Sequence, residues 1–249
     1  MLQRPIKVTV DALARLMRVR RLGEPHITLR PEPTWLPPHV DLTADDAMWR
    51  EFADVNLIDR SGRLDGDALD TITLLSRPTT EYFAMFVHKG VARSVLVATG
   101  VGSDEIVTAR RTGDVVTLSS SRQEQLPETL VRQLPQMPPA RIDSINVRQD
   151  ALAATNVRLS NTGVSDSRSD AAALLAIGNR RLVGQGELFV GSRENGNPYR
   201  MSVNPLRYHD IRSGRLLVTL SPGYVSITPA TDQLIIDRLR RAHADLLAD

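Results

Sequence analysis

The sequence predicts an α+β protein with a quasi-two-fold plan, in which residues 1–155 and 156–249 contribute to a central, mainly antiparallel β-sheet. In each half, runs of β-branched and aromatic residues are separated by short connections that mostly contain glycine, the pattern of an antiparallel meander. Segments with helical apolar periodicity precede and follow both meanders. Both halves thus repeat one plan of helix, four-strand meander and helix. Two such halves most simply share one sheet, with the helices grouped on one side.

The N-terminal segment predicts a short strand at Ile6–Val8 and then a helix that starts near Val10 and ends near Gly23. The apolar stripe of this helix consists of Val10, Leu13, Leu16 and Met17. Because these residues recur three and four positions apart, they share one helix face, which we expect to be buried.

A proline-rich stretch from His26 to Pro38 predicts an extended connector on the surface, anchored by Trp35 and Leu36. Thr43 is expected to cap the next helix, with Asp46 as a variant of the capping box. The buried face of that helix consists of Met48, Phe52 and Val55.

An acidic corner from Asp59 to Asp70 follows, with a spacing like that of a calcium loop. Leu64 stands where such a loop needs a glycine for its sharp turn, and Arg63 stands at a ligand position. We therefore interpret the corner as a structural connection between helices. The next helix ends at Pro78, whose ring forbids the following hydrogen bond. Its apolar face consists of Leu69, Ile72 and Leu75.

Four strands and a short helix complete the first half. The predicted strands are Tyr82–His88, Arg93–Thr99, Glu105–Arg110 and Asp114–Leu118. Leu126–Leu134 predicts a helix that ends at Pro135, and Arg141–Val147 predicts a further strand.

The second half begins with a polar stretch, Asn156–Ser169, which predicts a mobile loop, and a helix at Asp170–Ile177. Its predicted strands are Leu182–Val190, Tyr199–Asn204, Leu206–Ile211 leading into Arg215–Leu220, and Tyr224–Thr228. Asn195-Gly196 is a hairpin signal between the first pair. Thr228 is expected to cap the closing helix, with Pro229 at its first position. The turns at Gly113-Asp114-Val115 and Gly223-Tyr224-Val225 align between the halves.

Composition excludes several classes of function. The net charge is only +2, which gives no strong attraction to nucleic acid or to an anionic membrane. The chain has no cysteine, so thiol catalysis, disulfides and zinc–thiolate sites are excluded. We recognise neither a signal peptide nor an apolar run long enough to span a bilayer, so we expect a cytoplasmic protein without membrane insertion.

No pattern predicts a catalytic, metal or cofactor site. The histidines lack metal-binding spacing, and we expect all of them at the surface or at sheet edges. His209 and Asp210 are adjacent on a strand and should point to opposite faces. Gly100-Val101-Gly102 and Gly184-Gln185-Gly186 do not continue into a dinucleotide fingerprint, so we interpret both as tight turns or bulges.

A protein-interaction surface is the remaining kind of site. Apolar residues on strands of the second half include Phe189, Tyr199 and Met201, and the closing helix has more large apolar residues than a narrow stripe needs. Each of these residues individually is expected to fill the core, because most apolar residues are buried. As a set they are the best candidate for contact with an apolar part of another protein.

Three stretches resemble the EspG family, the cytosolic chaperones of mycobacterial type VII (ESX) secretion. The first, ADVNLIDRSGRLDGDALDTITLLSRPTTEY, is similar to the family's pair of early helices, L-I-D-x-x-G-R corner, R-P stop and first meander strand. The start, KVTVDALARLMRV, resembles its strand-into-helix opening. The end, YHDIRSGRLLVTLSPGYVSITPA, resembles its D-x-x-x-G-R strand followed by a G-(aromatic)-V strand.

This resemblance implies a quasi-two-fold sheet with two helical bundles and a role as a non-enzymatic chaperone. The implied partner is a PE–PPE heterodimer, bound at the apolar tip of the PPE helical bundle and kept soluble for the secretion machine. Carried over to this chain, the implied contact residues are Phe189, Tyr199, Met201, Leu174, Ile177, Leu234, Ile235 and Leu239. The connection Lys89–Ala92 is short here, whereas in the family it can be longer and contact the client.

The residues alone leave two other interpretations of the function open. One is an enzyme of unrecognised type, which would need a deep pocket lined by converging polar groups. The other is a structural or self-assembling module, for example a homodimer formed through an exposed sheet edge.

Overall fold

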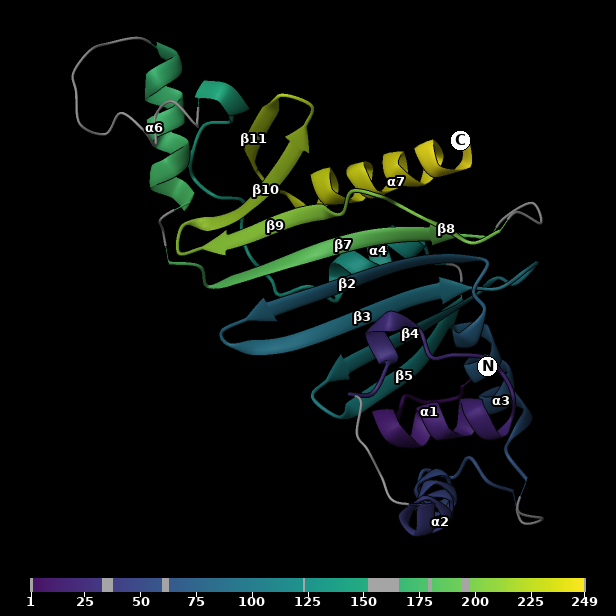
Figure 1. Cartoon of the computed structure of the whole chain (residues 1–249). Coiled ribbons are helices and arrows are strands. Elements are labelled where there is room, and N and C mark those ends of the chain that lie inside the picture. The colour runs from purple at the N-terminus through teal and green to yellow at the C-terminus, as the bar shows by residue number, and fades with distance from the viewer. Residues whose placement is uncertain are drawn as a thin grey trace.

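The computed structural model describes residues 2–32, 38–59, 63–122, 124–151, 166–178, 181–193 and 198–248. Its strands form one 11-stranded sheet in the order β1-β5-β4-β3-β2-β7-β9-β10-β11-β6, with β8 paired to β7 (Figure 1). All of these pairings are antiparallel. The strands are β1 (Ile6–Thr9), β2 (Thr80–His88), β3 (Val91–Thr99), β4 (Glu105–Thr112), β5 (Val115–Arg122), β6 (Ile145–Arg148), β7 (Gly184–Ser192), β8 (Arg200–Met201), β9 (Leu206–Ile211), β10 (Gly214–Ser221) and β11 (Tyr224–Pro229).

The strand order confirms the predicted quasi-two-fold plan. β2 and β7 pair at the centre, and each starts a meander that runs outward to β5 or to β11. The short strand that opens each half, β1 or β6, then pairs with the last strand of its meander. Gly113 and Gly223 occupy the corresponding turns with φ of 58° and 77°, so the predicted alignment of these turns is confirmed. β6 lies before the predicted boundary at residue 155 and pairs with β11 of the second half.

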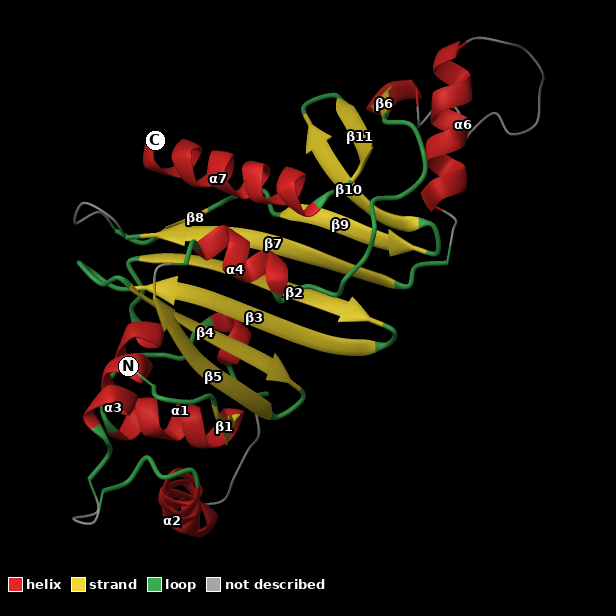
Figure 2. Cartoon of the chain, turned by 180° about the vertical axis from the view of Figure 1, so that it is seen from behind, coloured by secondary structure: helices red, strands yellow, loops and turns green. Residues whose placement is uncertain are grey.

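Helices lie on both faces of the sheet, so the prediction of helices on one side is wrong (Figures 1 and 2). The helices are α1 (Val10–Val19), the 3₁₀ helix η1 (Ile27–Leu29), α2 (Pro38–Asp54), α3 (Gly66–Ser76), α4 (Leu126–Arg132), α6 (Asp166–Gly178) and α7 (Asp232–Ala248). Neighbouring residues on one strand show the division: Leu216 belongs to the core cluster beneath α6, and Leu217 to the cluster beneath α4 and α7. A sheet that is apolar on both faces must be covered on both.

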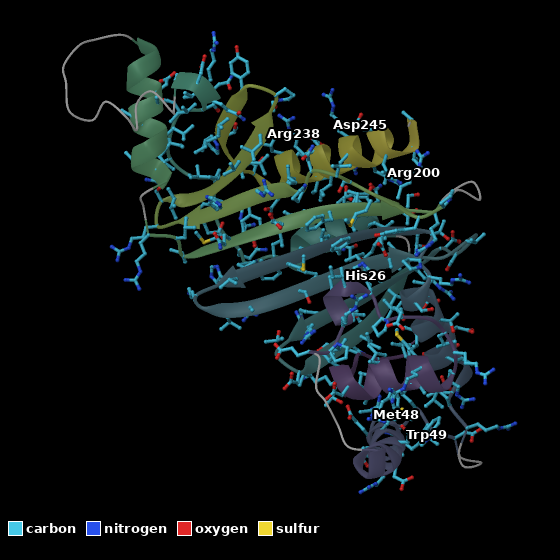
Figure 3. All side chains as sticks on the ribbon, in the orientation of Figure 1. His26, Met48, Trp49, Arg200, Arg238 and Asp245 are labelled. Carbon is cyan, nitrogen blue, oxygen red and sulfur yellow. The ribbon has the colours of Figure 1, made fainter. Side chains whose placement is uncertain are left out.

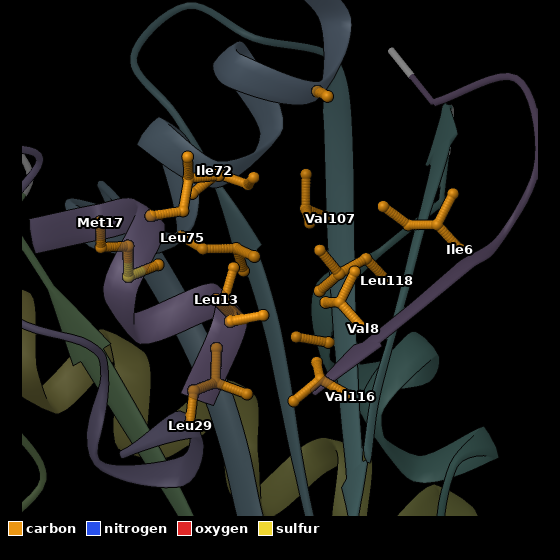
Figure 4. Packing of buried hydrophobic residues seen from close by; sticks show 14 of the residues in the cluster. Ile6, Val8, Leu13, Met17, Leu29, Ile72, Leu75, Val107, Val116 and Leu118 are labelled. Carbon is orange, nitrogen blue, oxygen red and sulfur yellow. The ribbon is translucent and has the colours of Figure 1, made fainter. Parts of the chain in front are cut away.

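Three apolar clusters form the core. The first lies between α1, α2, α3 and one face of the first meander, and includes the predicted stripe Val10, Leu13, Leu16 and Met17 (Figure 4). The second packs α4 and α7 against the other face of the central strands, around Tyr82, Phe86 and Tyr208. The third packs α6 against β6, β10 and β11.

Helix α1, which follows the first strand, is capped at both ends. The hydroxyl of Thr9 accepts a hydrogen bond from the backbone N–H of Ala12 at 3.2 Å and donates one to Glu51 at 2.8 Å. At the other end, Leu22 N–H bonds to Met17 O at 2.9 Å and Arg21 N–H bonds to Arg18 O at 3.1 Å, the two bonds of a Schellman motif. Arg21 takes the left-handed conformation, with φ 54°. The helix therefore ends at Val19, before the predicted stop at Gly23.

Several predicted helix boundaries are wrong. α2 begins at Pro38, so Thr43 lies inside it and is not its cap. α6 begins at Asp166, so the last residues of the predicted mobile loop are helical. Pro229 is the last residue of β11, and β6 does not extend as far as Pro229. Its missing N–H therefore costs the sheet no hydrogen bond. Thr231 instead caps α7, its hydroxyl accepting from Leu234 N–H at 3.1 Å.

Three further expectations need correction, and others concern residues outside the described ranges. Leu29 of η1 is fully buried, so the proline-rich connector is not wholly on the surface. Gly184 and Gly186 lie in the regular strand β7, opposite His88 and Phe86, and not in a turn or bulge. A Cβ at Gly186 would lie 2.6 Å from the Tyr208 ring, so the close packing of Tyr208 favours glycine there. The predicted strand at Tyr199–Asn204 is reduced to β8. The predicted anchors Trp35 and Leu36, the Asn195-Gly196 signal and residues 156–165 lie outside the described residues. No described helix is long and apolar enough to cross a membrane.

Candidate functional site

The central strands β2, β7 and β9 are covered on one face and open on the other. On the covered face, Tyr82, Leu188 and Tyr208 are buried beneath α4 and α7. On the other face, η1 contacts β3 and part of β2, and α6 packs against β6 and β10. Between them, no described helix covers the rest of β2, β7 and β9 (Figure 1). We call this surface the open face; its central residues are Met85, Val87, Gln185, Glu187, Arg207 and His209.

Register and alternation place these residues together. Met85 of β2 is opposite Glu187 of β7, which is opposite Arg207 of β9. Directly opposite residues share a face, and every second residue along a strand returns to it. The next row on the same face is therefore Val87, Gln185 and His209. Met85 is partly exposed and Val87 is 39% exposed, although both lie in the middle of a large sheet.

The open face is concave. A groove of about 1080 Å³ runs over it, lined at the centre by Met85, Val87, Glu187, Arg207 and His209. Ile27 of η1 and the hairpin residue Val91 form part of its rim, 55% and 41% exposed. The lining also includes charged residues toward the margins, among them Arg93 and Arg111. The groove therefore combines apolar side chains with charged ones, as protein interfaces do.

One ion pair, His209 and Gln185 supply the polarity at the centre of the groove. Arg207 Nε donates to Glu187 Oε1 at 2.7 Å, and both side chains are 40% exposed. Burial lowers the pKa of His209 below its ordinary value of 6.5; Asp210 opposes this shift and Arg207 adds to it. His209 is therefore neutral near pH 7, which keeps the charge of the groove floor low.

At the end of the open face where β2 begins, a buried carboxylate joins distant segments. Glu81 is 1% exposed and accepts a hydrogen bond from the Tyr199 hydroxyl at 2.5 Å. His26 Nε2 lies 3.4 Å from the same Glu81 oxygen, above the central strands (Figure 3). Burial and then the Glu81 carboxylate raise the pKa of Tyr199 above its ordinary value, so the hydroxyl stays protonated and donates. The guanidinium of Arg193 covers the Tyr199 ring at 4.4 Å.

Three of the predicted contact residues lie on the open face. Phe189 stacks on Phe83 with a centroid distance of 4.8 Å and remains partly exposed. Met201 of β8 pairs with Gly191, beside Glu81, and is 42% exposed. Tyr199 is 39% exposed. These residues extend the open face toward β8.

The structure does not bring the other five predicted residues to this face. Leu174 and Ile177 lie on α6 and are buried in the third cluster, against the sheet. Leu234, Ile235 and Leu239 lie on α7, on the opposite side of the sheet, and pack into the second cluster. Ile235 and Leu239 are at most 1% exposed, so a partner would reach them only if α7 moved. Contact between these five residues and a partner stays a prediction.

The sequence interpretation missed the groove floor. Met85 and Val87 lie in the predicted strand Tyr82–His88, whose two faces the sequence does not distinguish, and no motif singles out Glu187 or Arg207. The alternation in Gln185-Gly186-Glu187-Leu188 is the signal that could have identified one polar face of β7.

The histidines are distributed differently from the prediction. His26 and His88 are largely buried, with side chains 11% and 13% exposed. His26 caps η1 and His88 lies on the central strand β2, so their assignment to the surface or to sheet edges is wrong. His209 and Asp210 point to opposite faces, as predicted: His209 lies in the groove, and Asp210 is fully buried on the other side. Among the described residues, no group of three or more histidine and acidic side chains could hold a metal ion.

Comparison with known proteins gives a family match and several structural matches. The model of the EspG family matches residues 9–241. Among solved structures, the chain is similar to the Mycobacterium tuberculosis type VII secretion system chaperone EspG5, solved in complex with a PE25–PPE41 dimer. The TM-score is 0.66 at 15% identity, over 98% of this chain and 97% of that chain, so this likeness shows the fold. No curated protein matches the sequence.

Proposed function

The chain belongs to the EspG family, and from that premise we propose that it is a chaperone of type VII secretion that acts in the cytoplasm. Its client is a PE–PPE-type heterodimer, which it keeps soluble and directs to the secretion machine. The similar fold of EspG5, a chaperone solved with a PE25–PPE41 dimer, supports this proposal. The proposal assigns no catalytic residue and no cofactor.

The observation that carries the proposal is the contrast between the two faces of the same central strands. Tyr82 and Leu188 are at most 2% exposed on one face, whereas Val87 is 39% exposed on the other. An apolar surface left open in the middle of a sheet drives association with other apolar surfaces. We therefore place the client on the open face, in contact with Met85, Val87 and Phe189 and, toward β8, with Tyr199 and Met201.

The short β2–β3 connection fits a client that lies on the sheet itself. β2 and β3 are joined by Lys89 and Gly90 alone, both at positive φ as in a type I′ turn. With so small a hairpin, the strand residues must supply most of the contact area.

Co-purification tests the proposal. The tagged chain is co-expressed with each PE–PPE-type pair encoded in the same genome, and complexes are analysed by size-exclusion chromatography with light scattering. We expect a complex with at least one pair, with a dissociation constant in the micromolar range or below. Val87→Asp should abolish it, because a buried, unpaired carboxylate would face the apolar client.

A matched control uses the same substitution outside the open face. Val101 lies in the β3–β4 turn and is 91% exposed, so Val101→Asp should leave the complex unchanged. The absence of any complex would contradict the proposed function. Equal binding by both variants would instead contradict the placement of the client on the open face. Light scattering of the chain alone also shows whether it forms a homodimer.

A further inference from the structure

Glu187 and Arg207 form the one ion pair that the described residues place on the floor of the groove. They stand directly opposite each other on β7 and β9. Their row continues to Met85 on one side and to Val218 on the other. The ion pair is therefore flanked by apolar side chains, and a protein that covers the groove removes it from water.

The pair has unused hydrogen-bonding groups. Among the described residues, Arg207 makes a hydrogen bond only through Nε, to Oε1 of Glu187. A guanidinium carries five N–H donors, so the donors on both terminal nitrogens remain available. The second carboxylate oxygen of Glu187 likewise has no hydrogen-bond donor among the described residues. The buried Arg215 differs, since its Nε and Nη2 bond to Asp210 and to the carbonyl of Pro135.

These groups specify what an occupant must provide. Charged groups that lose water without gaining partners are strongly unfavourable, so the occupant must bring acceptors to Arg207 and donors to Glu187. An added β-strand is excluded, because β7 and β9 already have neighbours on both sides at these residues. The tip of a helical hairpin has both kinds of group: one helix ends in free carbonyls with a negative partial charge, and the next begins with free N–H groups.

On the basis of the proposed function, we infer that the Glu187–Arg207 pair fixes the orientation of the client on the open face. The carbonyl end of one client helix lies over Arg207, and the N–H end of the following helix lies over Glu187. Apolar side chains of the same tip contact Met85 and Val87. Arg207 and Glu187 are thus specificity-determining residues of the site.

A charge swap tests this inference. The double variant Glu187→Arg with Arg207→Glu keeps an ion pair across the strands but reverses its polarity. The probe is the PE–PPE-type heterodimer that co-purifies with the unmodified chain, and calorimetry measures its dissociation constant. We expect the swap to weaken binding by about 100-fold or more, because two charge-assisted hydrogen bonds become like-charge contacts. Arg207→Gln and Glu187→Gln should each weaken binding by about 10-fold.

The control is an identical swap at another ion pair. Glu124 and Arg132 lie 2.5 Å apart beside α4, away from the groove. Glu124→Arg with Arg132→Glu should leave the dissociation constant unchanged. Unfolding temperatures show which variants fold, and if the Glu187/Arg207 swap does not fold, the two glutamine variants decide the result.

The outcomes separate this inference from the proposed function. If the swap and the glutamine variants bind like the unmodified chain while Val87→Asp does not bind, the orientation by Glu187 and Arg207 is wrong and the chaperone proposal stands. If the unmodified chain binds no PE–PPE-type dimer, both the orientation by this ion pair and the proposed chaperone function are wrong.

Discussion

The carboxylate of Asp210 accepts two hydrogen bonds from the guanidinium of Arg215, at 2.7 and 3.0 Å, across the turn that joins β9 and β10. Both side chains are at most 1% exposed. Arg215 also donates to the carbonyl of Pro135 at 2.8 Å and lies over the Tyr208 ring at 4.3 Å. The pair thus ties the connection between the two halves to the sheet. It also explains the D-x-x-x-G-R pattern in physical terms, since its first and last residues are these partners.

Removal of Arg215 should destabilise the fold strongly. Arg215→Ala leaves the buried Asp210 carboxylate unpaired, and we expect the free energy of unfolding to fall by about 3–5 kcal/mol. Urea unfolding followed by circular dichroism measures the change. The control is Arg148→Ala, since the Arg148–Asp150 pair is 65% exposed at both partners. It should cost no more than about 1 kcal/mol. Similar losses in the two variants would contradict a structural role for the buried pair.

Gly214 should tolerate a side chain less well than Gly223. Both have positive φ, at 132° and 77°, but a Cβ at Gly214 would lie 2.5 Å from the Pro138 carbonyl oxygen, whereas nothing lies within 4 Å at Gly223. Gly223→Ala should cost about 1–2 kcal/mol from backbone strain alone. Gly214→Ala should cost about 1–3 kcal/mol more, because the backbone of the connection must also shift. Thermal unfolding compares the stability of the two variants. Equal losses would show that the close approach of Gly214 to Pro138 does not affect stability.

The Tyr199 hydroxyl should stabilise the buried carboxylate of Glu81. Tyr199→Phe removes the donor that lies 2.5 Å from Glu81, and we expect a loss of about 1–3 kcal/mol in the free energy of unfolding. Tyr224→Phe is the matched control, because Tyr224 is 44% exposed at the β10–β11 hairpin. It should leave stability nearly unchanged. If Tyr199→Phe is as stable as the control, the hydrogen bond between Tyr199 and Glu81 contributes nothing to the free energy of unfolding.

Stability should fall with decreasing pH below 6.5, in part through His209. The pKa of His209 is lowered in the folded protein, so in this range the unfolded chain binds more protons and protonation favours unfolding. The stabilisation is fully present above pH 6.5 and is lost as the pH falls toward the folded pKa. We expect His209→Gln to show a smaller drop in unfolding temperature between pH 7.5 and 5.5 than the unmodified chain. Parallel curves would show that His209 does not contribute.

Most elements were predictable from local patterns. The apolar stripe of α1 and the four strands of the first meander follow from periodicities that a single segment displays. In the second half, the predicted strand at Tyr199–Asn204 is only the short β8, and the meander consists of β7, β9, β10 and β11. Helix boundaries were less predictable, because the residue that caps a helix depends on where the preceding element ends. Thr231, and not Thr228, caps α7, since β11 continues through Pro229 to pair with β10.

The candidate site was predictable only in part. Phe189, Tyr199 and Met201 were identified as apolar strand residues and lie on the open face. The apolar residues of α7 were grouped with them, although they pack against the opposite face. Composition and spacing alone do not distinguish an apolar residue beneath a helix from one beside an open groove.

The sequence by itself determined the repeated plan, the absence of cysteine chemistry and the position of most strands and helices, because each depends on residue type and local period. The tertiary structure alone decided which face of the central strands stays open. Alternation divides Met85 and Val87 from Tyr82 and Phe86, but α4 and α7, more than 35 residues further along the chain, cover only one of the two faces. Exposure of the groove floor is therefore a consequence of packing between distant segments, which no local pattern contains.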